Sequence, residues 1–445
     1  MDFISNQEPQ IGEMLLAIGL QRMEDLFAGV PSALKVEVPL EDDGMSEGEG
    51  LRLMEALAAK NAFSSFESYL GGGAYEHHVP ALVGAICGKS EFLTSYTPYQ
   101  AEASQGMLQV IFEFQSAICA LTGMEAANAS VYDGASACAE ALLMALRHQD
   151  PRRKLLVAES LHPHYREVVA QYLRGQEAQL EFIPFGSNGQ IEIETLRRHL
   201  GGEPAAVLIQ SPNFFGLLEP LHELFALTHE AGALAIACAN PLAYGLYASA
   251  GECGADIAVG DCQPFGIPLQ FGGPYAGYMA CRQELIRQLP GRIVGETLDV
   301  EGRRGFVLTL QAREQHIRRE KAKSNICTNQ ALAALASLIS MLWYGRKGVP
   351  ALALTNYRRA AYLRQQLASV QGVTVDLQSP IFNEFLVAFD QPVDEVQIRF
   401  RRHGIEPGIA LGRYFPSLAS YLLVTVTETK TQAQLDRYVK VTQER

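Results

Sequence analysis

The chain has 445 residues, 48% hydrophobic and 19% charged, a balance that predicts two or three folded domains and excludes a disordered protein. Its formal net charge of −13 argues against a nucleic-acid-binding protein, because phosphate binding needs clustered lysine and arginine side chains. Residues 1–10 contain no basic residue and are not typical of a signal peptide. No run of about 18 apolar residues predicts a membrane span. A cytoplasmic protein is expected.

The eight cysteines form no C-x-x-C pair, and most of them lie in apolar or small-residue runs. This pattern predicts reduced core thiols and argues against disulfides or zinc ligands.

Three zones follow one another along the chain. Residues 1–65 have a helical pattern and an acidic loop, and they predict an N-terminal helical arm. Residues 66–330 are expected to form a large domain, and residues 331–445 a small C-terminal α+β domain. The acidic residues of the first zone are Glu41, Asp42, Asp43, Glu47 and Glu49.

An amphipathic helix is expected before the sheet of the large domain, since Met107, Ile111, Phe114, Ile118 and Leu121 recur at helical spacing. Short continuous apolar runs then start roughly 25 residues apart, and helical segments separate most of them. This alternation is typical of right-handed crossover units and predicts a mostly parallel sheet that is buried on both faces. The predicted strands are Leu155–Ala158, Leu180–Pro184, Ala206–Ile209, Leu234–Ala237 and Ile257–Val259, and the predicted helices are Tyr165–Leu173, Glu192–Leu200 and Leu221–Ala231.

The last zone opens with an apolar helix at Gln330–Trp343. Further helices and strands then alternate in the pattern of a small α+β domain. The expected elements are helices Ala351–Leu367, Val393–His403 and Gln432–Thr442 and strands Phe385–Phe389 and Leu422–Val426.

Local motifs alone give weak functional signals. The run Asp133–Ala137 precedes a helix, where backbone N–H groups could hold a phosphate, although a plain N-cap explains it equally well. His77 and His78 are adjacent, and neighbouring side chains point apart, so we expect no metal site. The basic run Arg313–Lys323 has the pattern of a solvated helix face or of a binding patch. The glycine turn Phe271–Pro274 lacks the features of a nucleotide loop.

Longer strings carry a stronger signal. The run Gly291–Gln330 (GRIVGETLDVEGRRGFVLTLQAREQHIRREKAKSNICTNQ) closely resembles the alpha subunit of the glycine cleavage system P-protein family. So do Ser65–Pro80 (SFESYLGGGAYEHHVP), Thr94–Glu102 and Gly266–Gly277 (GIPLQFGGPYAG), and the similarity extends to Pro380–Glu384. The resemblance implies a three-layer α/β fold of the aspartate aminotransferase type, shared by pyridoxal-phosphate-dependent transferases of fold type I.

Enzymes of this type need a lysine that holds the cofactor and a carboxylate that keeps its pyridine nitrogen protonated. The lysine should follow the fifth strand, yet Asp261–Gly277 contains none, and Gln263 or Pro264 stands in its place. The carboxylate should close the fourth strand, where Cys238 stands. The resemblance therefore implies a beta subunit that holds the pyridoxal phosphate, and a chain that is inactive alone, with no catalytic residue of its own.

Two segments are the best candidates for completing a partner's cofactor site, since hydroxyl and amide donors from a neighbouring subunit commonly do so in this superfamily. Either segment could instead be structural. The candidate residues are Thr94, Tyr96, Thr97, Tyr99, Gln100, Ser324, Asn325, Thr328 and Asn329.

The function that the resemblance implies is decarboxylation of glycine, with transfer of the aminomethyl group to the lipoyl arm of the H-protein. The expected partners are the beta subunit, the lipoylated H-protein and glycine, with no metal, nucleic acid or membrane. Two alternatives stay open. One is a non-catalytic scaffold subunit, and the other is a self-sufficient pyridoxal-phosphate aminotransferase.

Overall fold

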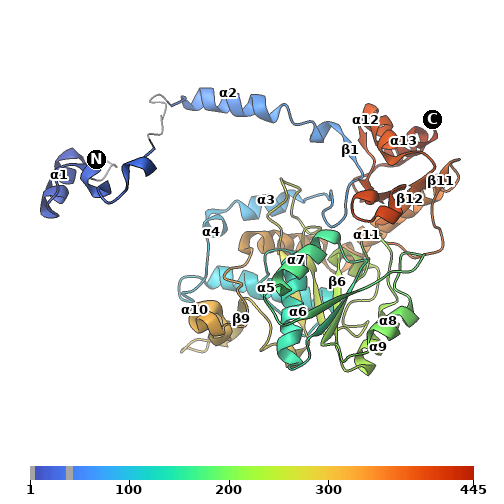
Figure 1. The fold of residues 1–445 in the computed structure, drawn as a ribbon, viewed down its shortest axis with the longest axis horizontal. Coiled ribbons are helices and arrows are strands. Elements are labelled where there is room, and N and C mark those ends of the chain that lie inside the picture. The colour runs from blue at the N-terminus through green and yellow to red at the C-terminus, as the bar shows by residue number, and fades with distance from the viewer. Residues whose placement is uncertain (1–5, 37–43, 445) are drawn as a thin grey trace. The chain divides into compact units, whose positions relative to one another are not determined.

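The computed structural model describes residues 6–36 and 44–444, and the chain divides into two compact units, Met1–Ser64 and Ser65–Arg445. The first unit contains helices α1 (Glu8–Ala17) and α2 (Glu47–Ala58) (Figure 1). Helix α2 begins with a capping box in which Ser46 and Glu49 exchange hydrogen bonds. The helical pattern expected here is confirmed, whereas Glu41, Asp42 and Asp43 lie outside the described residues. The predicted domain boundaries at 65 and 330 stay predictions.

The second unit is built on a seven-stranded sheet with the order β2-β8-β7-β6-β5-β3-β4. Strands β3 to β7 pair in parallel, and β8 runs antiparallel to both of its neighbours. All five predicted strands are present within about two residues of their expected ends. The strands are β2 (Ala126–Ala127), β3 (Lys154–Ala158), β4 (Gln179–Ile183), β5 (Ala206–Gln210), β6 (Leu234–Ala239), β7 (Ile257–Asp261) and β8 (Gly277–Cys281).

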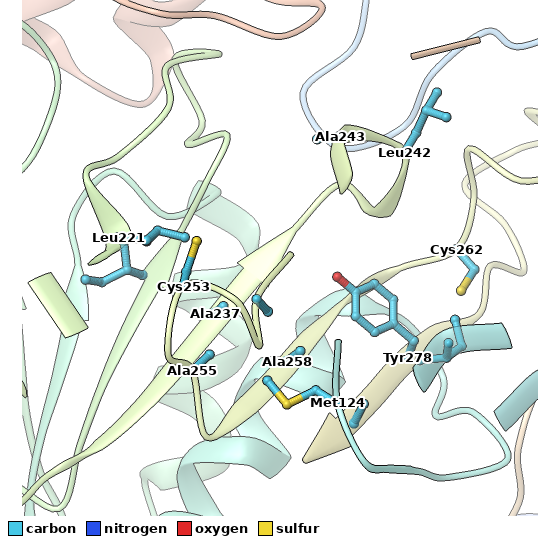
Figure 2. Close-up of a cluster of buried hydrophobic side chains, with 14 of the residues drawn as sticks. Met124, Leu221, Ala237, Leu242, Ala243, Cys253, Ala255, Ala258, Cys262 and Tyr278 are labelled. Atoms are coloured by element: carbon cyan, nitrogen blue, oxygen red, sulfur yellow. The ribbon is translucent and has the colours of Figure 1, made fainter. Parts of the chain in front are cut away.

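Helices cover both faces of this sheet, which confirms the predicted three-layer α/β fold (Figure 1). Strand β6 explains why the strand sequences are continuously apolar: Ala235 and Ala237 face one core, and Leu234 and Ile236 face the other. Figure 2 shows part of the first core, where Tyr278 packs among small side chains. The covering helices are α5 (Gln105–Thr122), α6 (Gly134–His148), α7 (Pro163–Leu173), α8 (Ile193–His199) and α9 (Leu221–Glu230).

The long element α11 (Ala331–Leu367) joins the large sheet to the C-terminal region. The two separate helices expected here meet at a kink, because Gly345 has a non-helical φ of 60° and Pro350 follows it. The C-terminal sheet has the order β11-β12-β15-β14 and is antiparallel. Its elements are β11 (Val373–Thr374), β12 (Glu384–Phe389), β14 (Ile409–Ala410), β15 (Tyr421–Thr425), α12 (Val393–Arg402) and α13 (Gln432–Gln443).

Shorter elements complete this unit. Strands β9 (Ile293–Leu298) and β10 (Arg304–Thr309) form an antiparallel hairpin beside α5. Beside short 3-10 helices, the unit contains β1 (Glu67–Ser68), which pairs with β13 (Ile405–Glu406), and helices α3 (Ala81–Cys87), α4 (Ser90–Leu93) and α10 (Gln315–Arg318). Over the described residues, no helix combines the length and apolar character that crossing a membrane would require.

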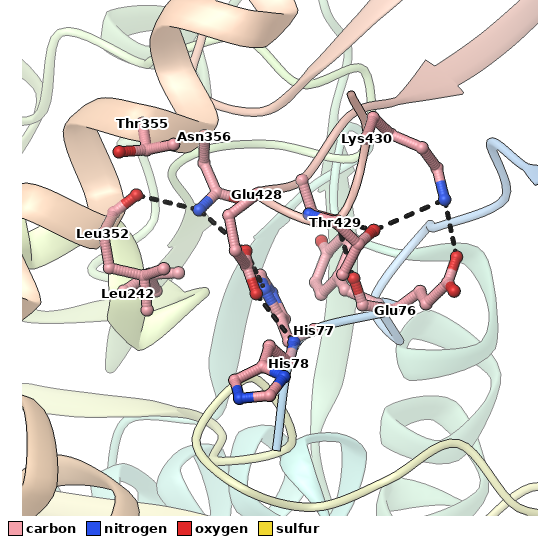
Figure 3. A network of polar contacts seen from close by, with 12 residues as sticks. Glu76, His77, His78, Leu242, Leu352, Thr355, Asn356, Glu428, Thr429 and Lys430 are labelled. Atoms are coloured by element: carbon pink, nitrogen blue, oxygen red, sulfur yellow. Dashed lines mark hydrogen bonds and ion pairs between the residues drawn. The ribbon is translucent and has the colours of Figure 1, made fainter. Parts of the chain in front are cut away.

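The adjacent histidines belong to a polar network that ties the segment after β1 to the C-terminal region (Figure 3). The Glu428 carboxylate accepts hydrogen bonds from His77 Nδ1 at 2.8 Å and from Asn356 Nδ2 at 3.0 Å. Close by, Lys430 Nζ lies 2.6 Å from Glu76 Oε2. The pKa of Glu428 is about 2: burial raises it, and the hydrogen bond and charge of His77 outweigh that effect. These contacts give His77 a structural partner, and the described residues hold no cluster of three or more metal-ligating side chains.

Candidate active site

The large sheet carries a small cavity at the carboxyl ends of β6 and β7, where ligands bind in open α/β sheets. The volume of this cavity is about 20 Å³. A space of this size holds one water molecule and excludes a pyridine ring. The lining residues are Gly73, Tyr75, His162, Tyr165, Gln210, Cys238, Ala239, Asn240, Gly260, Asp261 and Pro264.

Gln263 is one of the two residues predicted to stand in place of the catalytic lysine, and its side-chain amide is fully used inside the chain. Its Oε1 accepts a hydrogen bond from Tyr75 N, and its Nε2 donates to Tyr75 O, each at 2.8 Å. Nε2 also donates to Ile267 O at 2.9 Å. Gln263 is only 1% exposed, and its amide ties the loop that follows β7 to the backbone of Tyr75, which lines the cavity.

Two N–H groups of the first turn of α6 are bound by aspartate carboxylates of the chain itself. Asp133 caps the helix by accepting from Ser136 N at 2.7 Å, and Gly134 N donates to Asp261 Oδ2 at 3.0 Å. The N-cap explanation of this motif is therefore the one observed. Burial raises the pKa of Asp261 to about 7, although Gly134 N and Gln263 N donate hydrogen bonds to its carboxylate. The Tyr165 hydroxyl lies so close to Gly134 that a Cβ there would overlap it.

Cys238 lies at the end of β6, where the cofactor's carboxylate partner was expected, and it is 2% exposed. Burial, and then the neighbouring Cys238, raise the pKa of the Cys138 thiol well above its usual value. A thiol at this position provides no carboxylate to pair with a pyridinium ion. The cavity is too small to enclose the cofactor, no lysine lines it, and Cys238 stands in place of the carboxylate. The residues of the chain's own pocket therefore do not fit pyridoxal phosphate.

A second arrangement brings the two predicted segments together around an arginine that the sequence analysis did not select. Arg292 immediately precedes β9 and is 3% exposed. Its Nη1 donates to Thr328 Oγ1 at 3.2 Å and to Asn329 Oδ1 at 3.0 Å. Its Nη2 donates to Cys327 O at 2.8 Å and lies 3.5 Å from both Thr97 Oγ1 and Tyr99 OH.

We call Arg292, Thr97, Tyr99, Thr328 and Asn329 the Arg292 cluster. Each acceptor of the guanidinium in this cluster is neutral. None of the ion pairs formed by arginines among the described residues includes Arg292. Its Nε is buried without a hydrogen-bond acceptor in the part of the chain that the structure describes.

The other predicted site residues lie outside this cluster. Thr94 Oγ1 donates to Ser90 O at 3.0 Å at the end of α4, and Tyr96 is 74% exposed. Gln100 is exposed, and its backbone carbonyl accepts from Ala103 N. Ser324 and Asn325 line a separate polar groove of about 1160 Å³.

The basic run is only in part the solvated helix face that its pattern suggested. Arg313 is buried, and it donates to the carbonyls of Leu289 and Gly291, in the three residues before Arg292. Arg318, Arg319 and Lys321 are exposed, as expected. In the sequence, the feature that could have pointed to Arg292 is its positive charge directly before the apolar residues Ile293 and Val294.

Comparisons with known proteins agree with this architecture. A probable glycine dehydrogenase (decarboxylating) subunit 1 from Protochlamydia amoebophila is 64% identical over 444 residues, covering 100% of both chains. The crystal structure of a glycine decarboxylase (P-protein) of the glycine cleavage system, in inhibitor-bound form, has a TM-score of 0.89 and 40% identity, and the match covers 100% of this chain and 99% of that one. A sphingosine-1-phosphate lyase from Burkholderia pseudomallei shares the fold, with a TM-score of 0.67, 16% identity and coverage of 94% and 93%.

The sequence pattern of the glycine cleavage system P-protein family matches residues 1–442, which is nearly the whole chain. Together with the high identity and full coverage of the first relative, this match decides the family. The chain belongs to the glycine cleavage system P-protein family.

Proposed function

We propose that the chain is the alpha subunit, or subunit 1, of a two-chain glycine decarboxylase and that it acts with a beta subunit that holds pyridoxal phosphate. The observation that carries this proposal is the small cavity at the ends of β6 and β7, which is lined by no lysine and has a volume of only about 20 Å³. The relative from Protochlamydia amoebophila bears the name of a subunit 1, and a numbered subunit implies a second chain.

The reaction of the complex is then the decarboxylation of glycine, followed by transfer of the aminomethyl group to the lipoyl arm of an H-protein. When bound, pyridoxal phosphate supplies an electron sink for this chemistry. The alpha chain supplies the donors of the Arg292 cluster at the edge of the partner's site. Thr97, Tyr99 and Thr328 are the side chains proposed to reach that site.

The other predicted residues have different roles in this proposal. Both sides of the Asn329 amide are used within the chain, because its Nδ2 donates to Ala129 O at 3.0 Å, so it positions the cluster. Tyr96 and Gln100 are exposed and free to contact a partner subunit. Thr94 ends helix α4, and Ser324 and Asn325 form part of the groove wall.

The test is co-expression of this chain with its beta subunit, followed by an assay of glycine-dependent carbon dioxide release in the presence of lipoylated H-protein. We expect activity from the complex and none from either chain alone. Activity from the beta subunit alone, at the rate of the complex, would favour a scaffold role. Activity from this chain alone would favour a self-sufficient enzyme.

A further inference from the structure

Phe271 is a fully exposed aromatic side chain on the loop between β7 and β8. It is 102% exposed, the largest value among the exposed large hydrophobic residues that the structure describes. Single exposed apolar residues are common on protein surfaces, so the surroundings of Phe271 decide whether it has a partner. We call residues 268–275 the Phe271 loop.

The Phe271 loop contains no charge. The sequence between Asp261 and Arg282 has no Asp, Glu, Lys or Arg, although these residues make up 19% of the chain. Turns that face only water are usually polar, whereas the centre of a protein interface is rich in aromatic residues and depleted of charged ones. The composition of the loop is therefore that of an interface centre. The exposed and half-buried residues beside Phe271 are Pro268, Leu269, Gln270, Gly272, Gly273, Pro274 and Tyr275.

The backbone of Phe271 has a left-handed conformation, with a φ of 44°. Residues with a Cβ rarely adopt this conformation, because the Cβ comes too close to a backbone oxygen. A hydrogen bond from Gly273 N to Gln270 O, 2.8 Å long, closes the turn that holds it. The turn thus presents the ring to solvent on strained backbone, and no described residue covers the ring in return.

The base of the Phe271 loop is fixed to the segment that also supports the Arg292 cluster. Val131 N donates to Gly277 O at 2.8 Å, and Gly277 N donates to Val131 O at 3.1 Å. Two residues earlier, Ala129 O accepts a hydrogen bond from Asn329 Nδ2 of the cluster at 3.0 Å. The surface around Phe271 is therefore continuous with the surface that the proposed function assigns to the beta subunit.

We propose that the Phe271 loop is an anchor of the interface with the beta subunit, in which the Phe271 ring enters an uncharged, apolar pocket of that partner. This inference rests on the proposed function, which places the beta subunit against the Arg292 cluster. Burial of the ring offsets the strain of its backbone, and a few such aromatic anchors carry most of the binding energy of an interface. A second copy of this chain is the alternative occupant.

The first experiment identifies the occupant by photo-crosslinking. The photoreactive residue p-benzoylphenylalanine replaces Phe271 in the full chain, which is co-expressed with the beta subunit and irradiated as the purified complex. We expect an adduct that contains one copy of each chain, and mass spectrometry of its peptides locates the pocket. An adduct between two copies of this chain, or no adduct with the beta subunit, would overturn the inference.

Val300 provides the matched control position. It is 98% exposed at the turn between β9 and β10, but this turn is charged, since Arg303 Nε lies 2.7 Å from Asp299 Oδ2. The turn therefore has the composition of a solvated surface. The same photoreactive residue at position 300 should give at most a trace of adduct.

The second experiment measures the dissociation constant of the complex by sedimentation of a dilution series. Phe271→Asn removes the ring and suits the turn, because asparagine tolerates a positive φ better than most residues. The dissociation constant should rise by about thirty-fold or more, the scale of an interface anchor. Phe271→Met keeps an apolar side chain and should lose less affinity. Val300→Asn should bind as wild type does.

The stability of the isolated chain separates an anchor from a structural residue. Because the Phe271 ring packs against nothing in its own chain, the urea midpoint of Phe271→Asn should not fall below that of wild type. A lowered midpoint that accompanies the loss of affinity would overturn the anchor, because Phe271 would then act by stabilising its own loop.

The remaining outcomes separate this inference from the proposed function. Wild-type affinity in Phe271→Asn, or an equal loss of affinity in Val300→Asn, would overturn the anchor and leave the heteromeric decarboxylase intact. A wild-type chain that forms no active complex with the beta subunit would instead contradict the proposed function.

Discussion

Gln263 and the backbone of Tyr75 form a reciprocal pair of hydrogen bonds, each 2.8 Å long, in the loop after β7, where the lysine of a pyridoxal-phosphate enzyme is expected. The amide suits this position because it accepts and donates at once, whereas a lysine can only donate. In place of the cofactor's anchor, the chain therefore has a structural contact between the loop after β7 and Tyr75.

This contact predicts the behaviour of a chain in which the two missing groups are restored. Gln263→Lys combined with Cys238→Asp should not produce an active alpha subunit. The lysine leaves Tyr75 N without an acceptor, which costs about 1–3 kcal/mol, and the cavity remains too small for the cofactor. Urea denaturation measures the expected loss of stability, and glycine-dependent carbon dioxide release without the beta subunit measures activity. Activity close to that of the complex would contradict the prediction.

The isolated chain should also fail to hold the cofactor covalently. No lysine lies between Asp261 and Gly277, the stretch in which the fold would place it. Borohydride reduction in the presence of pyridoxal phosphate, followed by mass spectrometry of peptides, should give no adduct at a single defined lysine. The beta subunit, treated in parallel, is the positive control. A specific pyridoxyl-lysine in this chain would show that the pocket has been misinterpreted.

The N-terminal unit should become resistant to proteases when the beta subunit is added. Helix α2 buries no residue, and its apolar side chains Leu51, Met54 and Leu57 are exposed. Exposed apolar surface of this kind is typical of an obligate interface. Trypsin should cut the isolated chain at Arg52 and Lys60, and the complex at least about ten-fold more slowly. An unrelated protein at the same concentration gives the baseline, and equal cleavage rates would argue that this unit stays outside the interface.

Glu219 should make the chain less stable as the pH rises. Burial raises its pKa from 4.5 to about 7, although Asn213, Ile191 N and Ser160 donate hydrogen bonds to it. The folded state thus binds the proton more tightly than the unfolded state. The contribution of this proton to the free energy of unfolding is complete below pH 4.5 and is lost as the pH rises through 7. The free energy of unfolding falls by about 3 kcal/mol over this range.

The measurement for this prediction is the free energy of unfolding in urea at several pH values between 4.5 and 8. In Glu219→Gln the free energy of unfolding should change with pH by about 3 kcal/mol less than in wild type. The control is Glu223→Gln, at an exposed position on α9, which should follow wild type. Identical pH profiles for wild type and Glu219→Gln would mean that the carboxyl keeps its ordinary pKa.

The sequence by itself determined the layered α/β fold, because continuous apolar runs such as Leu234–Ala237 occur where strands are buried on both faces. It also determined that the lysine is missing, since the absence of a residue type can be seen without a structure. The resemblance carried by Gly291–Gln330 identified the correct family.

Only the tertiary structure decided which polar residues act together. Thr97 and Thr328 are separated by more than two hundred positions, and no local pattern links them to Arg292. Arg313 likewise belongs to a run that is mostly exposed, but it is buried because it binds the carbonyls before Arg292. Local periodicity predicts which face of an element is buried, whereas the partners of a buried charge depend on how distant segments pack.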